Sequence, residues 1–233
     1  MKYLSNILIL AGIVLISFFG YNYFSMEQAQ ENSLAEAKEK IAEGQKDLQK
    51  IDTQSSSENM AESNKEHNNE QLKKQTETGD NNYTSSKNTV TNTPKQTIQF
   101  QAEFNEAFAT LDIPKLGKTL PIVEGTDPNS LEKGVGHLSE SVFPGDNEQI
   151  VLSGHRDTVF RNFGELVIGD QFVVNMPYGS YDYTIKETEI VPEDDTSVIR
   201  KMNEEVLVVT TCYPFSYVGF APERFVAYAY PTK

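Results

Sequence analysis

The chain has 233 residues, of which 34 are acidic and 20 basic, so its formal net charge is −14. This length allows one or two domains, and an acidic chain without a basic run is a poor partner for the phosphates of nucleic acids. The single cysteine excludes an intramolecular disulfide. We therefore expect no nucleic-acid partner, and a lone thiol that is either reactive or simply buried.

The first segment, residues 1–26, is expected to be a transmembrane signal anchor. Residues 3–26 carry no charge, and about 20 apolar residues suffice to cross a bilayer as a helix. Lys2 precedes this run and Glu27 follows it, so the positive-inside rule places the carboxyl-terminal part outside the cell. A cleaved signal peptide is the alternative, but the bulky residues 21–26 leave no small-residue cleavage site. The sequence therefore predicts a single-pass protein of the cell membrane.

Two polar segments are expected to separate this anchor from the folded part. Residues 27–51 have apolar side chains at heptad spacing with Glu and Lys between them. Because the pattern lasts for fewer than three heptads, a solvated juxtamembrane helix is favoured over a coiled-coil stalk. Residues 52–97 are rich in Ser, Asn, Gln, Thr, Lys and Glu, and such a composition buries too little apolar surface to offset chain entropy. We interpret 52–97 as a flexible, disordered tether with a reach of roughly 40 Å.

The remaining residues, 98–233, form the predicted folded domain, which holds 21 acidic and 10 basic residues. Its apolar runs are short, rich in β-branched residues and separated by Gly and Pro, a pattern that is typical of strands. Many short strands at even spacing predict an all-β barrel or sandwich. Only 98–108 has the spacing of a helix. The clearest predicted strands are Thr110–Ile113, Gln149–Ser153, Gln171–Asn175, Tyr181–Ile185, Glu205–Thr211 and Arg224–Tyr230.

The lone cysteine, Cys212, stands at the end of the most apolar of these runs. The run 205–212 is almost continuously β-branched or apolar, which predicts a central buried strand. Pro214 cannot continue a central ladder, so Cys212 marks the point where the strand opens onto a loop. Reactive residues are common at such strand ends. The alternative is a small buried side chain, which is the usual fate of a free cysteine.

Arg224 opens the next strand and is a candidate electrostatic partner. If its strand pairs antiparallel with the one that ends at Cys212, the two residues flank the mouth of one hairpin. A guanidinium there favours a thiolate or stabilises a developing oxyanion. The alternative is an ordinary surface ion pair with Glu223 or Asp182.

Two histidines compete for the role of proton carrier. His155 follows Gly154 at the end of the strand 149–153, where the glycine lets the chain turn, and His137 lies in another short apolar stretch. A cysteine nucleophile needs a group that protonates the leaving amine, and histidine is the usual one at neutral pH. The spacing does not choose between the two, and either is also compatible with a structural histidine. Neither the acidic residues nor the histidines have the spacing of a metal site.

Three motifs together resemble the active-site signature of the sortase family. They occur in the family's order and are Leu152-Ser-Gly-His-Arg-Asp157, Val209-Thr-Thr-Cys-Tyr-Pro-Phe215 and Ala221-Pro-Glu-Arg224. The opening segment 111–125 is also similar to that of sortases. The run 212–219 is most similar to the class D sortases of Gram-positive bacteria. The resemblance covers roughly residues 105–230.

The resemblance implies an eight-stranded sortase-type β-barrel with short helices, and we expect no cofactor. It selects His155 over His137 and implies that Cys212, His155 and Arg224 are catalytic, with Thr211 contributing to substrate binding at the oxyanion site. Cys212 is then expected to cleave an LPxT-like sorting signal of surface proteins through a thioester, and an amine of a peptidoglycan precursor to resolve it. Another extracellular Cys-His peptidase and a non-catalytic wall-binding domain remain as alternatives.

Overall fold

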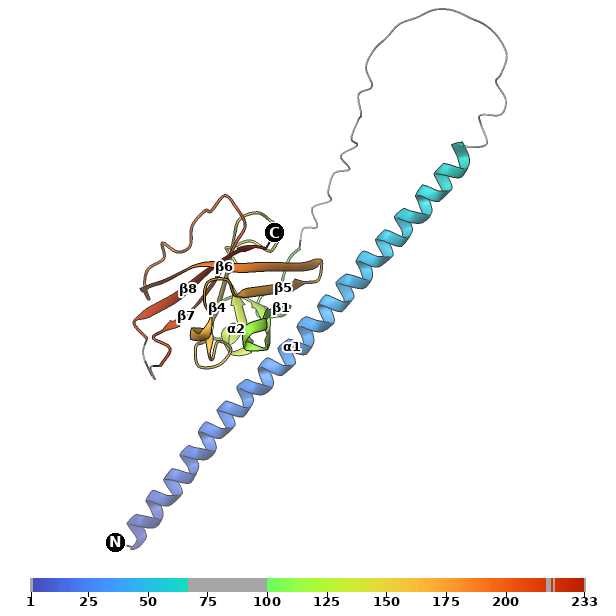
Figure 1. Ribbon diagram of the computed structural model, residues 1–233. Helices are drawn as coiled ribbons and strands as arrows, with labels where there is room; N and C mark the ends of the chain where they lie inside the picture. The colour runs from blue at the N-terminus through green and yellow to red at the C-terminus, as the bar shows by residue number, and fades with distance from the viewer. Residues whose placement is uncertain (1, 67–99, 217–218, 220, 233) are drawn as a thin grey trace, which may run out of the picture. The chain divides into compact units, whose positions relative to one another are not determined.

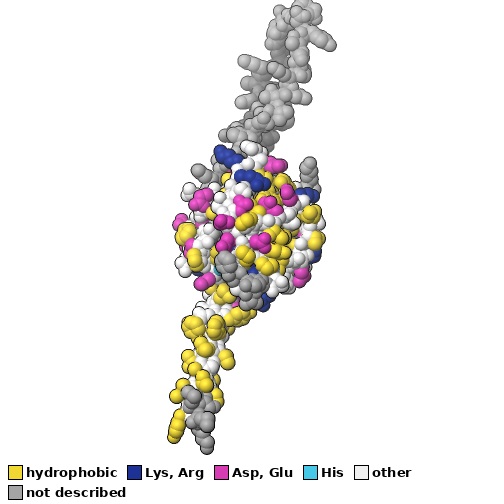
Figure 2. Space-filling view, turned by 90° about the vertical axis from the view of Figure 1, so that its left-hand side faces the viewer, with side chains coloured by type: hydrophobic (Ala, Val, Ile, Leu, Met, Phe, Trp, Pro, Cys, Tyr) yellow, Lys and Arg dark blue, Asp and Glu magenta, His cyan; other side chains and the backbone are white. Residues whose placement is uncertain are grey.

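The computed structural model describes residues 2–66, 100–216, 219 and 221–232 (Figure 1). The first element is a single long helix, α1 (Lys2–Glu66). Large apolar side chains are exposed along its first part, including Ile7, Val14 and Phe18, and they are visible in Figure 2. By length and composition α1 can cross a bilayer, and it is the one helix of this kind in the described part of the chain.

Helix α1 does not end at residue 51, where the sequence predicted the start of the tether. It continues to Glu66, and no Gly or Pro interrupts residues 45–66, so nothing in that stretch breaks a helix. Residues 52–66, which we expected to be flexible, are therefore helical. The rest of the predicted tether, residues 67–97, lies outside the described residues.

The folded domain is a closed barrel in which the strand order is β1-β2-β3-β4-β7-β8-β6-β5. The strands are β1 (Ala107–Ile113), β2 (Lys118–Glu124), β3 (Val135–His137), β4 (Gln149–Gly154), β5 (Gln171–Met176), β6 (Gly179–Pro192), β7 (Val206–Tyr213) and β8 (Glu223–Pro231). The short helices are η2 (Pro114–Leu116), α2 (Pro128–Lys133) and η3 (Phe163–Glu165). Two neighbouring pairs, β2 with β3 and β4 with β7, are parallel. The predicted all-β barrel of eight strands is confirmed.

The helix expected over 98–108 was wrong. The described residues before Ala107 form turns and bends, and Ala107 and Phe108 already belong to β1. The apolar residues whose spacing suggested a helix pack in another way: Phe100 and Phe108 lie against each other, with ring centroids 5.7 Å apart. Both rings also contact Phe143. Tertiary packing of these aromatic residues therefore decides the local structure.

The barrel interior and one outer face are both apolar. The interior contains, among others, Leu152, Leu207 and Val209. A second cluster contains the alternate residues Val151, Val206 and Val208 together with partly buried side chains of the β6–β7 connection. Because successive side chains of a strand point to opposite faces, β7 is covered on both sides. This explains its unbroken apolar sequence and makes it a rigid support for the cysteine at its end.

Candidate active site

The parallel strands β4 and β7 end side by side, and this places two predicted site residues together. Gly154 and Thr211 are register partners in the last pair of this ladder. The buried hydroxyl of Thr211 donates a hydrogen bond of 2.8 Å to the carbonyl oxygen of Gly154. His155 and Cys212 are the residues that follow. The two strand ends are therefore tied together immediately before the imidazole and the thiol.

Gly154 is required by close packing rather than by a turn. A Cβ atom at this position would lie 2.5 Å from Cε2 of Phe160 and 2.8 Å from Cγ2 of Val159. Its φ is not in the left-handed region, so the backbone itself would accept other residues. The glycine lets the segment after His155 fold back against β4.

The hairpin of β7 and β8 adds the guanidinium. Cys212 and Arg224 are register partners across this antiparallel pair, as we expected for antiparallel pairing of these two strands. Arg224 Nη1 donates to the carbonyl oxygens of Ala221 and Glu223, each at 3.0 Å. These bonds hold the side chain at the start of β8.

The ion pair that we considered for Arg224 involves a different carboxylate. Arg224 Nη2 lies 3.3 Å from Oε2 of Glu193, which follows the end of β6. Glu223 accepts a hydrogen bond from Arg224 only through its backbone oxygen. Because both side chains of this pair are partly exposed, water screens their attraction.

The three predicted side chains line one cleft of about 440 Å³ at this end of the barrel. Cys212 is half-buried and His155 is exposed, so the thiol is neither sealed in the interior nor fully solvated. The lining residues are His155, Arg156, Asp157, Thr158, Glu193, Cys212, Gly219, Ala221 and Arg224. The cleft therefore combines a thiol, an imidazole and a guanidinium.

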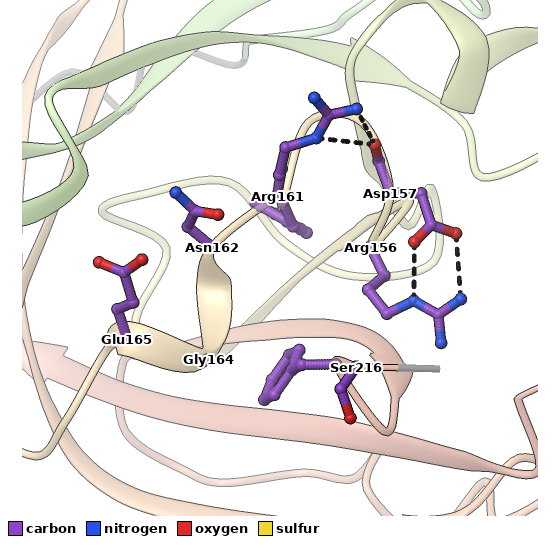
Figure 3. Close-up of a pocket in the computed structure, with 9 residues that line it drawn as sticks. Arg156, Asp157, Arg161, Asn162, Gly164, Glu165 and Ser216 are labelled. Carbon is purple, nitrogen blue, oxygen red and sulfur yellow. Dashed lines mark hydrogen bonds and ion pairs between the residues drawn. The ribbon is translucent and has the colours of Figure 1, made fainter. Parts of the chain in front are cut away.

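Arg156 is a cleft residue that the sequence reasoning overlooked. Its side chain is almost fully buried and donates twice to the carboxylate of Asp157, from Nε and from Nη2, each at 3.0 Å (Figure 3). Nη1 donates to the carbonyl oxygen of Pro214 at 2.8 Å. The bonds to Asp157 raise the pKa of the guanidinium against the opposing effect of burial, and Cys212 adds to the rise through its charge. The same bonds lower the pKa of Asp157.

A second cavity of about 460 Å³ adjoins the cleft and shares Arg156 and Asp157 with it (Figure 3). It lies between the segment that follows His155 and the segment that follows Cys212. Its other lining residues are Phe160, Arg161, Asn162, Gly164, Glu165, Phe215 and Ser216. The Arg156–Asp157 pair thus forms part of the wall of both cavities.

His137 lies elsewhere, in a closed environment. Its Nδ1 is 2.7 Å from Oε2 of Glu124, and its Nε2 is 3.1 Å from the carbonyl oxygen of Val142. The ring is buried and stacks on Phe143 with centroids 4.7 Å apart. Both ring nitrogens therefore have buried partners, and His137 does not line the cleft.

A closed β-barrel with a thiol, an imidazole and a guanidinium in one cleft at its rim is the architecture of a cysteine acyltransferase. The sequence profile described as "Sortase domain" matches residues 111–232. The chain is also 54% identical over 139 residues to "Sortase D" of Bacillus subtilis (strain 168), covering 59% of this chain and 70% of that protein. The chain belongs to the sortase family and is a cysteine transpeptidase.

Solved structures of sortases have the same fold. A Clostridium perfringens sortase D5 transpeptidase superposes with a TM-score of 0.52 at 26% identity, covering 57% of this chain and 83% of that one. Sortase C of Clostridium perfringens SM101 gives a TM-score of 0.51 at 27% identity, covering 57% and 73%. Sortase C1 of Streptococcus agalactiae gives 0.51 at 26% identity, covering 55% and 68%. In each comparison the shared part is little more than half of this chain, which is close to the extent of the barrel.

Proposed function

We propose that this sortase cleaves an LPxT-like sorting signal of surface proteins and transfers the released acyl group to an amine of a peptidoglycan precursor. The observation that carries this proposal is the common cleft of Cys212, His155 and Arg224. Family membership supports the class of reaction, and the cleft supports the assignment of its steps to these residues.

In the first step, the Cys212 thiolate attacks the carbonyl carbon of the Thr residue in the signal. The carbon–sulfur bond forms, the peptide carbon–nitrogen bond breaks, and the leaving amine takes a proton from His155. Thiolates are strong nucleophiles, and the imidazolium already holds the proton that the amine needs. Arg224 cannot replace His155 as the acid, because a guanidinium does not release a proton near neutral pH.

Arg224 and Thr211 contribute to the stabilisation of the negative charge that develops in this step. The guanidinium, held by two carbonyl oxygens of its own chain, faces negative charge on the thiolate and on the tetrahedral intermediate. The hydroxyl proton of Thr211 is already donated to Gly154. The predicted contribution of Thr211 to the oxyanion site is therefore through the position that it gives to Cys212 and His155.

In the second step, an amine attacks the thioester carbon, a new amide bond forms and Cys212 leaves as the thiolate. The attacking nitrogen gives up a proton to His155, which restores the imidazolium for the next cycle. If water attacked instead, the same site would be a peptidase. The fate of the thioester thus separates the transpeptidase from the alternative Cys-His peptidase.

We also propose that residues 1–26 anchor the enzyme in the cell membrane with the barrel outside the cell. The exposed apolar side chains of α1 support a membrane span, and the charges at its two ends support this orientation. Protease added to intact protoplasts should then degrade the barrel and leave a short membrane-bound fragment. Protection of the barrel would contradict the orientation.

The proposed function is tested by incubating the full-length enzyme in detergent with a library of LPxT peptides and a mixture of amine acceptors. We expect a thioester on Cys212 by mass spectrometry, its release by hydroxylamine, and amide products in excess over hydrolysis. The variant Cys212→Ala is the control. Hydrolysis alone would favour the peptidase, and no adduct with any peptide would favour the wall-binding alternative.

A further inference from the structure

We infer that Arg156 is a positioning residue that fixes the chain segment carrying Cys212 and places a second positive charge beside the thiol. The inference rests on the proposed use of Cys212 as a nucleophile. It concerns a residue that lines the cleft but belongs to neither strand end.

The first observation is that one hydrogen bond joins the two chain segments before the reacting groups, and another joins them after these groups. Before them, Thr211 donates to Gly154. After them, Arg156 donates to the carbonyl oxygen of Pro214 at 2.8 Å. The ladder between β4 and β7 has already ended at this point. The hydrogen bond from Arg156 to Pro214 therefore joins the two chain segments where the strands no longer pair.

The second observation is the burial of the Arg156 guanidinium. Its side chain is only 4% exposed, whereas that of Asp157 is 72% exposed. A buried cation is costly unless it is paired and hydrogen-bonded. The two bonds to Asp157 satisfy this condition and fix the plane of the guanidinium. Its remaining Nη1 is thereby directed at Pro214 in one orientation.

The third observation is that the segment after Cys212 packs on the segment after His155. The ring of Phe215 lies against Gly164, where an added Cβ would be 2.6 Å from its Cδ2. Arg156 therefore adds a polar contact between these segments to the apolar contact of Phe215. A change at Arg156 should loosen Phe215 and Ser216 as well as Cys212.

The fourth observation is the charge of Arg156 itself. Its guanidinium lines the same cleft as Cys212, and negative charge on that side chain would raise the pKa of the guanidinium further. A positive charge nearby favours a thiolate over a thiol. Arg224 and Arg156 thus approach Cys212 from different elements, β8 and the segment after β4.

The experiment compares Arg156→Gln and Arg156→Lys with Arg161→Gln in the full-length protein in detergent. Arg161 is an exposed arginine of the same loop whose guanidinium donates to the backbone oxygen of Asp157 and not to its carboxylate, which makes it a matched control. Iodoacetamide alkylation of Cys212 is followed from pH 5 to 10, and amide exchange is measured at Phe215 and Ser216. Neither readout needs a substrate, so a failure here is distinct from a failure of the proposed transpeptidation.

For Arg156→Gln we expect the pH of half-maximal alkylation to rise by about half a unit or more, and amide exchange to become about tenfold faster. Arg156→Lys keeps the charge but not the paired geometry. It should therefore restore most of the pH profile while exchange stays fast. Arg161→Gln should leave both readouts unchanged. Unchanged readouts in Arg156→Gln, or equal changes in Arg161→Gln, would overturn the inference.

If Arg156→Gln does not fold, Asp157→Asn decides the question, because Asn has nearly the same shape as Asp and its amide oxygen can still accept one hydrogen bond from the buried guanidinium. Removing the carboxylate releases the guanidinium from its fixed plane. We expect about threefold faster exchange at Phe215 and Ser216, without a rise in the pH of half-maximal alkylation. Exchange at the wild-type rate would overturn the positioning role.

Discussion

The surroundings of the two histidines of the barrel, His137 and His155, differ in almost every physical respect. His137 is buried, has a partner for each ring nitrogen and stacks on an aromatic ring. His155 is exposed at the end of β4 and lines the cleft that contains Cys212. Both follow short apolar runs, so the sequence pattern alone did not separate them.

This difference shows what makes a histidine useful for proton transfer. A ring whose two nitrogens are held by buried partners cannot exchange a proton with a substrate without breaking those bonds. A ring at a solvent-facing strand end has a free nitrogen and a neighbouring nucleophile. We therefore propose that His137 serves stability and His155 serves chemistry, and four changes test this proposal and the surroundings of the two sites.

The largest effect is expected for His155→Ala. Loss of a general acid should reduce the rate of transpeptidation by about 10²–10⁴-fold. The melting temperature should stay within a few degrees of wild type, because the side chain is exposed. Steady-state assays and calorimetry measure the two quantities. Retention of more than a tenth of the activity would remove His155 from the mechanism.

The opposite pattern is expected for His137→Ala. Removing the ring leaves the buried carboxylate of Glu124 without its histidine partner and with only the hydrogen bond from Ser139, which should lower the free energy of unfolding by about 3 kcal/mol. The activity of each folded molecule should fall less than threefold. Denaturant unfolding gives the free energy of unfolding, and active-site titration of Cys212 gives the activity of each folded molecule. A specific loss of activity without destabilisation would reverse the assignment of the two histidines.

A smaller, pH-dependent effect is expected for Glu124→Gln. Burial alone would raise the pKa of Glu124, but hydrogen bonds from His137 and Ser139 hold it below its usual range. A carboxylate with a depressed pKa in the folded state stabilises the protein above its unfolded pKa of about 4.3. That stability is lost as the pH falls through the lower folded value.

The free energy of unfolding of wild type and Glu124→Gln should therefore differ most near neutral pH and converge below about pH 4. Urea unfolding at several pH values measures this convergence. A constant difference at all pH values would mean that Glu124 contributes through packing and not through its charge.

The smallest effect is expected for Glu193→Gln. The carboxylate pairs with Arg224 at 3.3 Å, but both side chains are partly exposed. Such a pair should contribute less than about 1 kcal/mol to stability. Arg224 keeps its two backbone acceptors, so transpeptidation should change less than threefold. A tenfold loss would mean that Glu193 takes part in the cleft directly.

The sequence predicted those parts of the fold and site that depend on local pattern. The unbroken apolar run before Cys212 and the proline after it identified the end of β7. The strand β8 was also predicted, and its antiparallel pairing with β7 was the condition under which Cys212 and Arg224 were expected to meet. The strands β2 and β3 were not singled out, and the helix expected at 98–108 was wrong because aromatic packing between distant segments produced its spacing.

Other features depend on long-range contacts that one sequence does not display. Arg156 stands in the motif 152–157, but its bonds to Asp157 and Pro214 are visible only in the structure. The end of α1 could not be located because residues 45–66 contain no helix-breaking residue. The choice of His155 required the family resemblance, since burial is what separates it from His137.

The central claim is that Cys212 forms the thioester with the help of His155. The most direct measurement is the rate of single-turnover acylation of wild type, His155→Ala and His137→Ala by one sorting-signal peptide, followed by intact mass and peptide mapping. We predict one adduct on Cys212, formed at similar rates in wild type and His137→Ala and at least a hundredfold more slowly in His155→Ala. An adduct on another residue, or equal rates in all three proteins, would contradict the account.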